Sequence, residues 1–158
     1  MKPSAAVLTV SDSVAIGSRV DASGPAVMAA LEQAGFTVSA REIVPDERAV
    51  IEAAIKRLAG KADLVVTTGG TGVAQRDVTP EATRAVCERL VDGVAERMRS
   101  ESARKTPLAA LSRGVCGICG KSLVVNLPGS PAAATESLAA VIGILPHALE
   151  LLRGKTEH

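Results

Sequence analysis

Short apolar runs alternate with longer amphipathic segments along the first half of the chain. The runs over 5–10, 37–44 and 62–67 are too short for helices and are bounded by turn residues, which is typical of strands. The segments over 24–35 and 47–58 are longer and end at or near glycines, which predicts helices. The second of them has an apolar stripe made of Val50, Ile51, Ala54, Ile55 and Leu58.

A third strand–helix unit follows, and Thr79 and Pro80 mark the start of its helix. Thr is a good N-cap residue and Pro is favoured at the first helical position, so we expect Thr79 to cap a helix that continues to about Leu90. Strands and helices in this alternation predict a three-layer α/β fold, with a mostly parallel sheet and helices on both faces. In such sheets ligands bind at the carboxyl ends of the strands.

The pattern changes in the second half of the chain. A charged helix is predicted over 94–105 and a shorter one over 107–113, while apolar runs split by glycines over 114–127 predict a β-hairpin added to the sheet. A tight turn then leads into a last, buried helix, and its residues are Pro128, Gly129, Ser130 and Pro131. Since no repeat or linker divides the sequence, we expect a single domain over 1–158.

Composition and charge narrow the classes of function. A chain of 158 residues can bury roughly 70% of its unfolded surface, and with 47% apolar residues, no Trp or Tyr and one Phe its core must consist of aliphatic side chains. The net charge of +1 gives no reason to expect a nucleic acid or an anionic membrane as partner. The N-terminal apolar run is interrupted at 11–13, too early for a signal peptide or a membrane span, so we expect a cytoplasmic protein.

The three cysteines include a CxxC spacing at Cys116 and Cys119. An odd count without an export signal argues against a disulfide framework. No second CxxC or His pair stands at a suitable distance for zinc, and a redox pair would be expected at a strand-to-helix turn. We therefore interpret both cysteines as small apolar residues of the hairpin.

A glycine-rich loop over 67–72, with the sequence TTGGTG, follows the third predicted strand. Three glycines within four residues allow positive φ and let a ligand approach main-chain N–H groups. Thr68 and Thr71 add hydroxyl donors. Taken alone, the loop is as typical of a turn without a ligand as of an anion site.

Two aspartates favour the anion site. Asp46 follows the second strand and Asp77 comes two residues before Thr79, so both lie at the expected ligand edge. The residue type of Asp46 also suits a plain N-cap, which its position alone favours. Together, however, two carboxylates beside amide donors suit a phosphate bound with Mg²⁺, because carboxylates bind hard cations and amides bind phosphate oxygens.

Seven segments, in order along the chain, carry a family resemblance. They are TVSDS (9–13), DASGP (21–25), VPDE (44–47), TTGGTG (67–72), RDVTPEAT (76–83), TPLAALSR (106–113) and LPGSP (127–131). Together they resemble the molybdopterin-binding family of Mog/MoaB type, whose catalytic members are molybdopterin adenylyltransferases of molybdenum cofactor biosynthesis. The resemblance extends from about Ala6 to the last helix, and the combination of GGTG with DVTPEAT at this spacing makes it specific.

The resemblance implies a reaction in which the terminal phosphate of molybdopterin attacks the α-phosphorus of ATP and expels pyrophosphate. Such transfers depend on alignment and charge neutralisation, so no nucleophilic side chain is needed. Asp46 and Asp77 match the two essential acidic positions of the family, and we expect them to orient Mg²⁺ and the ATP phosphates.

Further positions match the substrate-binding segments of the family. The phosphate-binding loop corresponds to Gly69, Gly70, Thr71 and Gly72, and the second nucleotide-side turn to Pro128, Gly129, Ser130 and Pro131. Ser112 matches a position on the pterin side. Ser130 departs from the family, which often has Asn there, and a hydroxyl offers fewer donors than an amide. Ser11 and Asp12 match the loop after the first strand, where a turn that caps its own backbone is an equal alternative.

Basic residues flank the TPLAALSR segment, among them Arg104, Lys105 and Arg113. At helical spacing such residues are more typical of a solvated face than of a binding patch. Contact with the pterin phosphate is the alternative, favoured mainly for Arg113.

The resemblance also implies a homotrimer, with molybdopterin, ATP and other cofactor-biosynthesis proteins as partners, and leaves open whether the pathway uses molybdenum or tungsten. Two alternatives to the enzyme are a pterin-binding carrier without turnover and a scaffold module. The intact acidic and TPEAT residues favour the enzyme, and the sequence ends without room for a partner domain, which weakens the scaffold alternative.

Overall fold

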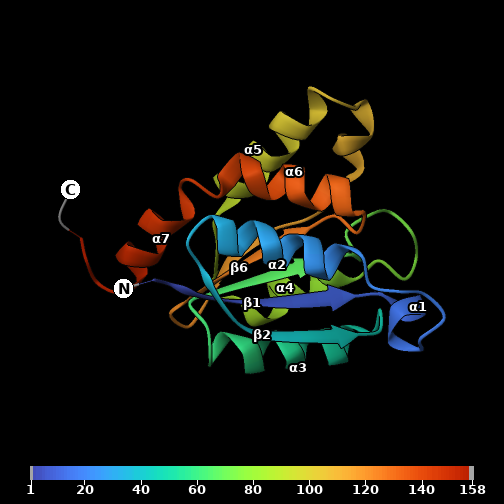
Figure 1. Ribbon diagram of the computed structural model, residues 1–158, viewed down its shortest axis with the longest axis horizontal. Helices are drawn as coiled ribbons and strands as arrows, with labels where there is room; N and C mark the ends of the chain where they lie inside the picture. The colour runs from blue at the N-terminus through green and yellow to red at the C-terminus, as the bar shows by residue number, and fades with distance from the viewer. Residues whose placement is uncertain (1, 157–158) are drawn as a thin grey trace.

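The computed structural model describes residues 2–156, which form a six-stranded mixed sheet with helices on both faces (Figure 1). The strands are β1 (Ser4–Val10), β2 (Thr37–Val44), β3 (Leu64–Thr68), β4 (Arg89–Leu90), β5 (Cys116–Cys119) and β6 (Ser122–Leu127). Their order across the sheet is β2-β1-β3-β6-β5-β4, and β2, β1, β3 and β6 are mutually parallel. β5 and β4 are antiparallel additions at one edge.

Two helical layers cover the sheet. In chain order the helices are α1 (Asp12–Ala15), α2 (Ser23–Gln33), α3 (Arg48–Ala59), α4 (Thr79–Val86), α5 (Asp92–Ala103), the 3₁₀ helix η1 (Pro107–Leu111), α6 (Pro131–Val141) and α7 (Leu145–Leu152). Apolar residues of α2, α5, α6 and α7 pack on one face of the sheet, and those of α3 and α4 pack on the other. The three-layer α/β prediction is confirmed.

Alternation along the strands explains the two cores. In β1, Ala5 and Val7 face the core under α2, whereas Ala6, Leu8 and Val10 face the core under α3. Since both faces are covered, the strand reads as a nearly continuous apolar run, as parallel strands generally do.

The hairpin prediction needs one correction. β5 and β6 do form an antiparallel hairpin, but β6 also pairs in parallel with β3, with Leu64 opposite Leu123 and Thr68 opposite Leu127. The second strand of the hairpin is therefore a central strand of the sheet. Sequence patterning could not reveal this. β6 follows β5 along the chain, but in the sheet it lies between β3 and β5.

Both predicted ends of α4 were wrong. Val78 occupies the N-cap position, and the Thr79 hydroxyl donates to the Gly69 carbonyl at 3.0 Å instead of capping the helix. The helix ends at Val86, because the following backbone pairs with β5 through N–H donation from Glu88 and Val91. The last predicted helix is in turn divided into α6 and α7.

The cysteines lie among apolar side chains. Cys116 is buried in the core under α5, and Cys119 packs against the opposite core, so β5 separates the two thiols of the CxxC spacing. Burial raises the pKa of Cys116 and of the neighbouring Cys87 to about 12. Within residues 2–156, no single helix is long and apolar enough to span a membrane.

Candidate active site

Loops from four parallel strands meet at their carboxyl ends. Ser11, after β1, donates its N–H to Val44 at the end of β2, and Gly69, after β3, donates its N–H to Leu127 at the end of β6. The Thr68 hydroxyl donates to the Pro128 carbonyl at 2.7 Å. The predicted segments are therefore brought to one edge of the sheet, although Thr68 and Pro128, for example, are 60 positions apart in sequence.

The glycine-rich loop takes a backbone shape that other residues would not tolerate. Gly69 and Gly70 have φ of +104° and +68°, in the left-handed region that favours glycine. A Cβ on Gly69 would run into the Val10 carbonyl, and one on Gly70 would run into the Thr79 hydroxyl. The loop thus lies directly against β1 and α4.

Asp12 and Asp46 join the β1 and β2 loops. The Asp12 N–H donates to Asp46 Oδ2 and the Asp46 N–H donates to Asp12 Oδ1, both at 2.9 Å. The carboxylate of Asp46 therefore serves a neighbouring loop rather than the amides of α3, whose N-cap is Glu47, so the N-cap interpretation of Asp46 was wrong. Arg76 completes the cluster by donating to Asp12 Oδ2 at 2.6 Å and Oδ1 at 3.0 Å.

The pKa values of the two carboxylates in this cluster are shifted in opposite directions. Burial raises the pKa of Asp46, and the charges of Asp12 and Asp77 add to this against the hydrogen bond from the Asp12 N–H. Hydrogen bonds from Arg76, followed by the one from the Asp46 N–H, lower the pKa of Asp12. Burial and neighbouring negative charges thus disfavour the ionised form of Asp46, whereas Arg76 favours that of Asp12.

Asp77 ends the loop on the side of α4. Its Oδ2 accepts the Ala74 N–H at 3.0 Å, and its own N–H donates to the Ala74 carbonyl at 3.0 Å. A Cβ placed on Gly72 would lie 2.9 Å from Asp77 Oδ2, so the carboxylate sits beside the glycine-rich backbone.

Two adjoining cavities open at this edge. The first, of about 530 Å³, has a wall that includes Met98 and Leu111, and the second, of about 320 Å³, is lined by Ser11 and Asp46. Both are bounded by Gly70, Asp77, Gly129 and Ser130. The site therefore consists of two compartments with a common wall, and Asp77 stands at that wall.

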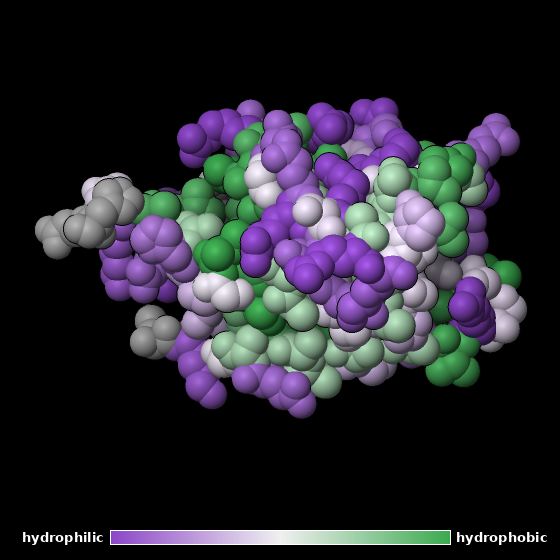
Figure 2. Space-filling view, turned by 90° about the horizontal axis from the view of Figure 1, so that it is seen from above, coloured by the Kyte–Doolittle hydropathy of each residue, from purple (hydrophilic) through white to green (hydrophobic). Residues whose placement is uncertain are grey.

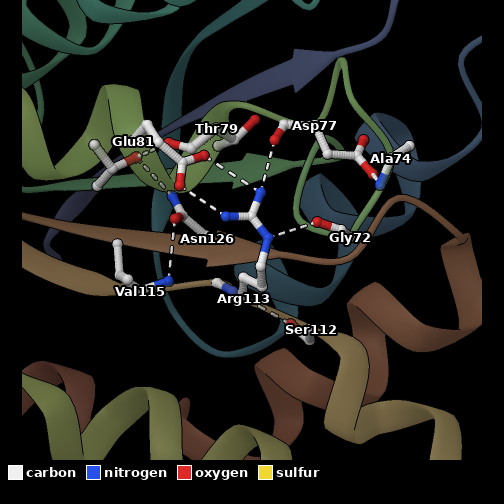
Figure 3. Close-up of polar contacts among 11 residues, drawn as sticks. Gly72, Ala74, Asp77, Thr79, Glu81, Ser112, Arg113, Val115 and Asn126 are labelled. Carbon is white, nitrogen blue, oxygen red and sulfur yellow. Dashed lines mark hydrogen bonds and ion pairs between the residues drawn. The ribbon is translucent and has the colours of Figure 1, made fainter.

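Arg113 holds both ends of the segment between Gly72 and Asp77 (Figure 3). Its Nε donates to the Gly72 carbonyl and its Nη2 to the Asp77 carbonyl, each at 2.7 Å. Its Nη1 donates to Glu81 Oε2 at 2.7 Å, and the hydrogen bond from Arg113 is the main cause that lowers the pKa of Glu81. The guanidinium thus faces protein acceptors.

Comparison with known proteins places the chain in a family. The model of the probable molybdopterin binding domain matches residues 6–147, which is most of the chain. The chain belongs to the probable molybdopterin binding domain family.

Individual members of the family are similar over nearly their whole length. The chain is 43% identical over 154 residues to the molybdopterin adenylyltransferase of Helicobacter pylori J99, covering 94% of this chain and 86% of the relative. The structure of the molybdopterin biosynthesis enzyme MoaB of Thermus thermophilus superposes with a TM-score of 0.91 at 49% identity, covering 96% and 97% of the two chains. The tungsten cofactor synthesizing protein MoaB of Pyrococcus furiosus gives 0.88 at 32% identity, covering 96% and 98%.

In this molybdopterin binding domain the predicted residues lie along both cavities. Besides the shared wall, the first cavity is lined by Thr71, Gly72, Ser112 and Pro128. The second is lined by Ser11, Asp46, Gly69 and Pro131. Of the residues matched to the binding and catalytic positions of the family, all within the described part of the chain, Asp12 is the one that lines neither cavity, and Arg104, Lys105 and Arg113 also line neither.

Two predicted serines have capping roles as well. Ser11 accepts the Val14 N–H at 3.3 Å, so the alternative of a self-capping turn holds for it alongside its place in the second cavity. Ser130 caps α6 by accepting the Ala133 N–H at 3.2 Å. Arg104 pairs with Glu101 and Lys105 pairs with Glu136. Hydrophilic side chains gather over the middle of the face seen in Figure 2.

The sequence analysis of this molybdopterin binding domain did not identify two residues whose hydrogen bonds hold the site together. Asn126 of β6 donates to the hydroxyls of Thr67 and Thr83 at 3.0 Å and accepts the Val115 N–H at 3.1 Å. The signal was present, since an Asn within the apolar run LVVNL needs partners when buried.

Asp21 was missed as well. It accepts from Thr9 Oγ1, the Gly24 N–H and Arg41 Nη2 at 2.6–3.0 Å, and its side chain is 4% exposed. Burial acts to raise the pKa of Asp21, but these hydrogen bonds outweigh it and lower that pKa.

Two carboxylates of this molybdopterin binding domain, Asp46 and Asp77, suit a magnesium ion that is also bound by substrate phosphates. Within residues 2–156 no group of three or more His, Cys, Asp or Glu side chains is placed to hold a metal by itself. Asp46 and Asp77 nevertheless both line the second cavity. Mg²⁺ typically binds one or two carboxylates together with substrate phosphates, so these residues fit it once a nucleotide is present.

Proposed function

We propose that this chain is a molybdopterin adenylyltransferase, which joins AMP from ATP to the terminal phosphate of molybdopterin and releases pyrophosphate. The observation that carries the proposal is the common wall of the two cavities at Gly70 and Asp77. A transfer between two substrates requires both reacting phosphates at one point, and two adjoining compartments provide it. The names of the relatives from Helicobacter pylori support the same reaction.

The chemistry needs little from the protein beyond alignment and charge. An oxygen of the molybdopterin phosphate forms a bond to the α-phosphorus of ATP while the bond from that phosphorus to the bridging oxygen breaks, and pyrophosphate leaves with the electron pair. The substrate supplies the nucleophile. In this proposal the N–H groups of Gly70, Thr71 and Gly72 bind phosphate oxygens, whereas the Gly69 N–H already donates to the Leu127 carbonyl.

Asp46 and Asp77 would hold Mg²⁺, which neutralises charge on the phosphate oxygens when it is bound. The raised pKa of Asp46, caused by burial and then by the charges of Asp12 and Asp77, supports this assignment, because crowded carboxylates favour a cation. Asp12 keeps Asp46 in place through their paired hydrogen bonds.

The finer parts of the proposal are a single domain over 1–158, a cytoplasmic homotrimer, and cofactor-biosynthesis proteins as partners. Val20, which lines the second cavity, is 86% exposed, and Ile16, four residues earlier in the chain, is 80% exposed; subunit contact would cover such apolar surfaces. Sedimentation analysis of the purified chain measures the subunit number directly.

The test is conversion of molybdopterin by the purified chain with ATP and MgCl₂, followed by chromatography. We expect adenylylated molybdopterin and pyrophosphate in equal amounts, no product with EDTA, and a loss of about 10²-fold or more in kcat for Asp77→Asn. Binding of molybdopterin without product would establish the carrier instead. Full activity of Asp77→Asn would remove Asp77 from the mechanism.

A further inference from the structure

The segment between Gly72 and Asp77 is a narrow-necked loop whose two ends are joined by one side chain. Arg113 Nε donates to the Gly72 carbonyl at one end and Nη2 donates to the Asp77 carbonyl at the other, both at 2.7 Å. The Arg113 N–H also donates to the Thr71 carbonyl at 2.8 Å. A residue 36 to 41 positions away in sequence therefore fixes where the loop leaves and rejoins the cavity wall.

Glu81 sets the orientation of the guanidinium. It lies in the first turn of α4 and accepts from Arg113 Nη1 at 2.7 Å and Nη2 at 3.3 Å. The ion pair therefore connects α4 to the segment between η1 and β5, across the neck of the loop (Figure 3). A planar guanidinium is suited to this, because its N–H groups point at several acceptors in one plane, which an ammonium cannot do.

We propose that the Arg113–Glu81 pair is a latch that positions Asp77 for adenylyl transfer. The inference rests on the proposed function and adds two positioning residues to it. Glu81 neutralises the guanidinium and turns it toward the loop carbonyls, so Arg113 acts as a donor to the protein rather than as a ligand of a substrate phosphate.

Two contacts hold Asp77, and the latch supplies one of them. Its carbonyl is held by Arg113, and its carboxylate is held by the N–H of Ala74 inside the loop. With the neck open, the carboxylate would shift relative to the glycine-rich backbone and to Asp46. A displacement of about 1 Å is enough to cost ~10²-fold in a reaction that depends on alignment.

The latch has little influence on global stability. The side chains of Arg113 and Glu81 are both 38% exposed, and ion pairs at such exposure are screened by water. We therefore expect Arg113→Lys and Glu81→Gln to fold with nearly unchanged melting temperatures. The matched control is Arg57→Lys with Glu42→Gln, another two-contact Arg–Glu pair, which joins α3 to β2 away from the loop.

Hydrogen exchange measures the loop without any substrate. In Arg113→Lys and Glu81→Gln we expect the amides of Ala74 and Asp77 to exchange about tenfold faster than in the unmodified chain, because the neck opens locally. The Arg57 and Glu42 variants should leave both amides unchanged. Unchanged exchange in the Arg113 and Glu81 variants would overturn the latch.

Adenylylation kinetics connect the loop to the chemistry. We expect kcat to fall about 10²-fold in both latch variants, a higher MgCl₂ concentration for half-maximal rate, and little change in KM for either substrate. Looser exchange with an unchanged kcat would overturn the positioning role. If the unmodified chain forms no adenylylated product, the proposed function fails, and the exchange measurement still decides whether the pair holds the loop.

Discussion

The main-chain N–H groups of Asp12 and Asp46 each donate to the carboxylate of the other, at 2.9 Å in both directions. This reciprocal pair fastens the loop after β1 to the loop after β2 and leaves Asp46 on the wall of the second cavity. Arg76 forms an ion pair with Asp12. Among the described residues, no Lys, Arg or His side chain forms an ion pair with the Asp46 carboxylate, which accepts the Asp12 N–H.

Replacing Asp46 should separate stability from activity. A carboxyl group with a raised pKa binds more protons in the folded than in the unfolded chain, so it lowers stability as pH rises from its ordinary pKa of 3.8 through the raised value. Asp46→Asn removes this loss and keeps an acceptor for the Asp12 N–H. We expect a melting temperature at neutral pH equal to or above that of the unmodified chain, with kcat reduced about 10²-fold or more. A lower melting temperature at neutral pH would contradict this.

Asp12 should show the opposite pH dependence. Its pKa is lowered by the hydrogen bonds from Arg76, so its contribution is present above the ordinary value of 3.8 and is lost as pH falls through the lowered pKa. We expect Asp12→Asn to lower the melting temperature at neutral pH and to have no such effect in strong acid. Thermal unfolding across this pH range, beside Asp46→Asn, makes the comparison.

Gly70→Ala tests the shape of the glycine-rich loop. The new Cβ would be strained at φ +68° and would meet the Thr79 hydroxyl, so we expect a loss of about 1–3 kcal/mol in the free energy of unfolding. Adenylylation should fall as well, since Thr79 must move away from Gly69. Gly143→Ala is the matched control, because a Cβ there meets nothing within 4 Å. Equal effects of the two substitutions on urea unfolding would argue against the steric account.

Asn126→Leu tests the buried polar link between β3, β6 and α4. The substitution leaves the Val115 N–H without its side-chain acceptor and the Thr67 and Thr83 hydroxyls without a donor, in a place where Asn126 is 2% exposed. We expect a loss of about 3 kcal/mol in the free energy of unfolding, measured in urea. Thr135→Ala, which removes a hydroxyl near the surface of α6, should change it by less than about 0.5 kcal/mol.

The thiols should be unreactive in the folded chain. Burial raises the pKa of Cys87 and Cys116 to about 12 from an ordinary value of 9.0, which lowers the thiolate fraction about a thousandfold at mildly alkaline pH. Alkylation followed by mass spectrometry should therefore label both residues slowly in the native chain and rapidly in urea. Rapid native labelling of the half-buried Cys87 would contradict the raised pKa of its thiol.

The pattern of apolar and polar residues was sufficient to predict elements whose bounds depend mainly on their own sequence. The predicted strand over 37–44 has the observed bounds of β2, and the helix predicted over 47–58 corresponds to α3 at Arg48–Ala59. The convergence of Asp46, Asp77 and the glycine-rich loop also followed from sequence, because parallel strands end at one edge whatever their partners are.

Residues that act between elements were beyond such patterning. Thr is a favoured N-cap residue, yet the Thr79 hydroxyl donates to the Gly69 carbonyl because the loop folds back onto α4. Arg113 was predicted to contact the pterin phosphate, and only the folded chain shows its guanidinium donating to Gly72 and Asp77. In both cases a contact between residues distant in sequence determines the partner of the side chain, and the residues next to it in sequence do not indicate that partner.

The central place of β6 determines when the site is assembled during synthesis. The Gly69 N–H and the Thr68 hydroxyl bind Leu127 and Pro128, so the glycine-rich loop has its native partners only after the polypeptide has grown about 60 residues past it. Until then β3 presents an unpaired edge to the nascent chain's surroundings. Ribosome-bound fragments that end before residue 122 lack β6 and the turn after it, so they should lack both cavities.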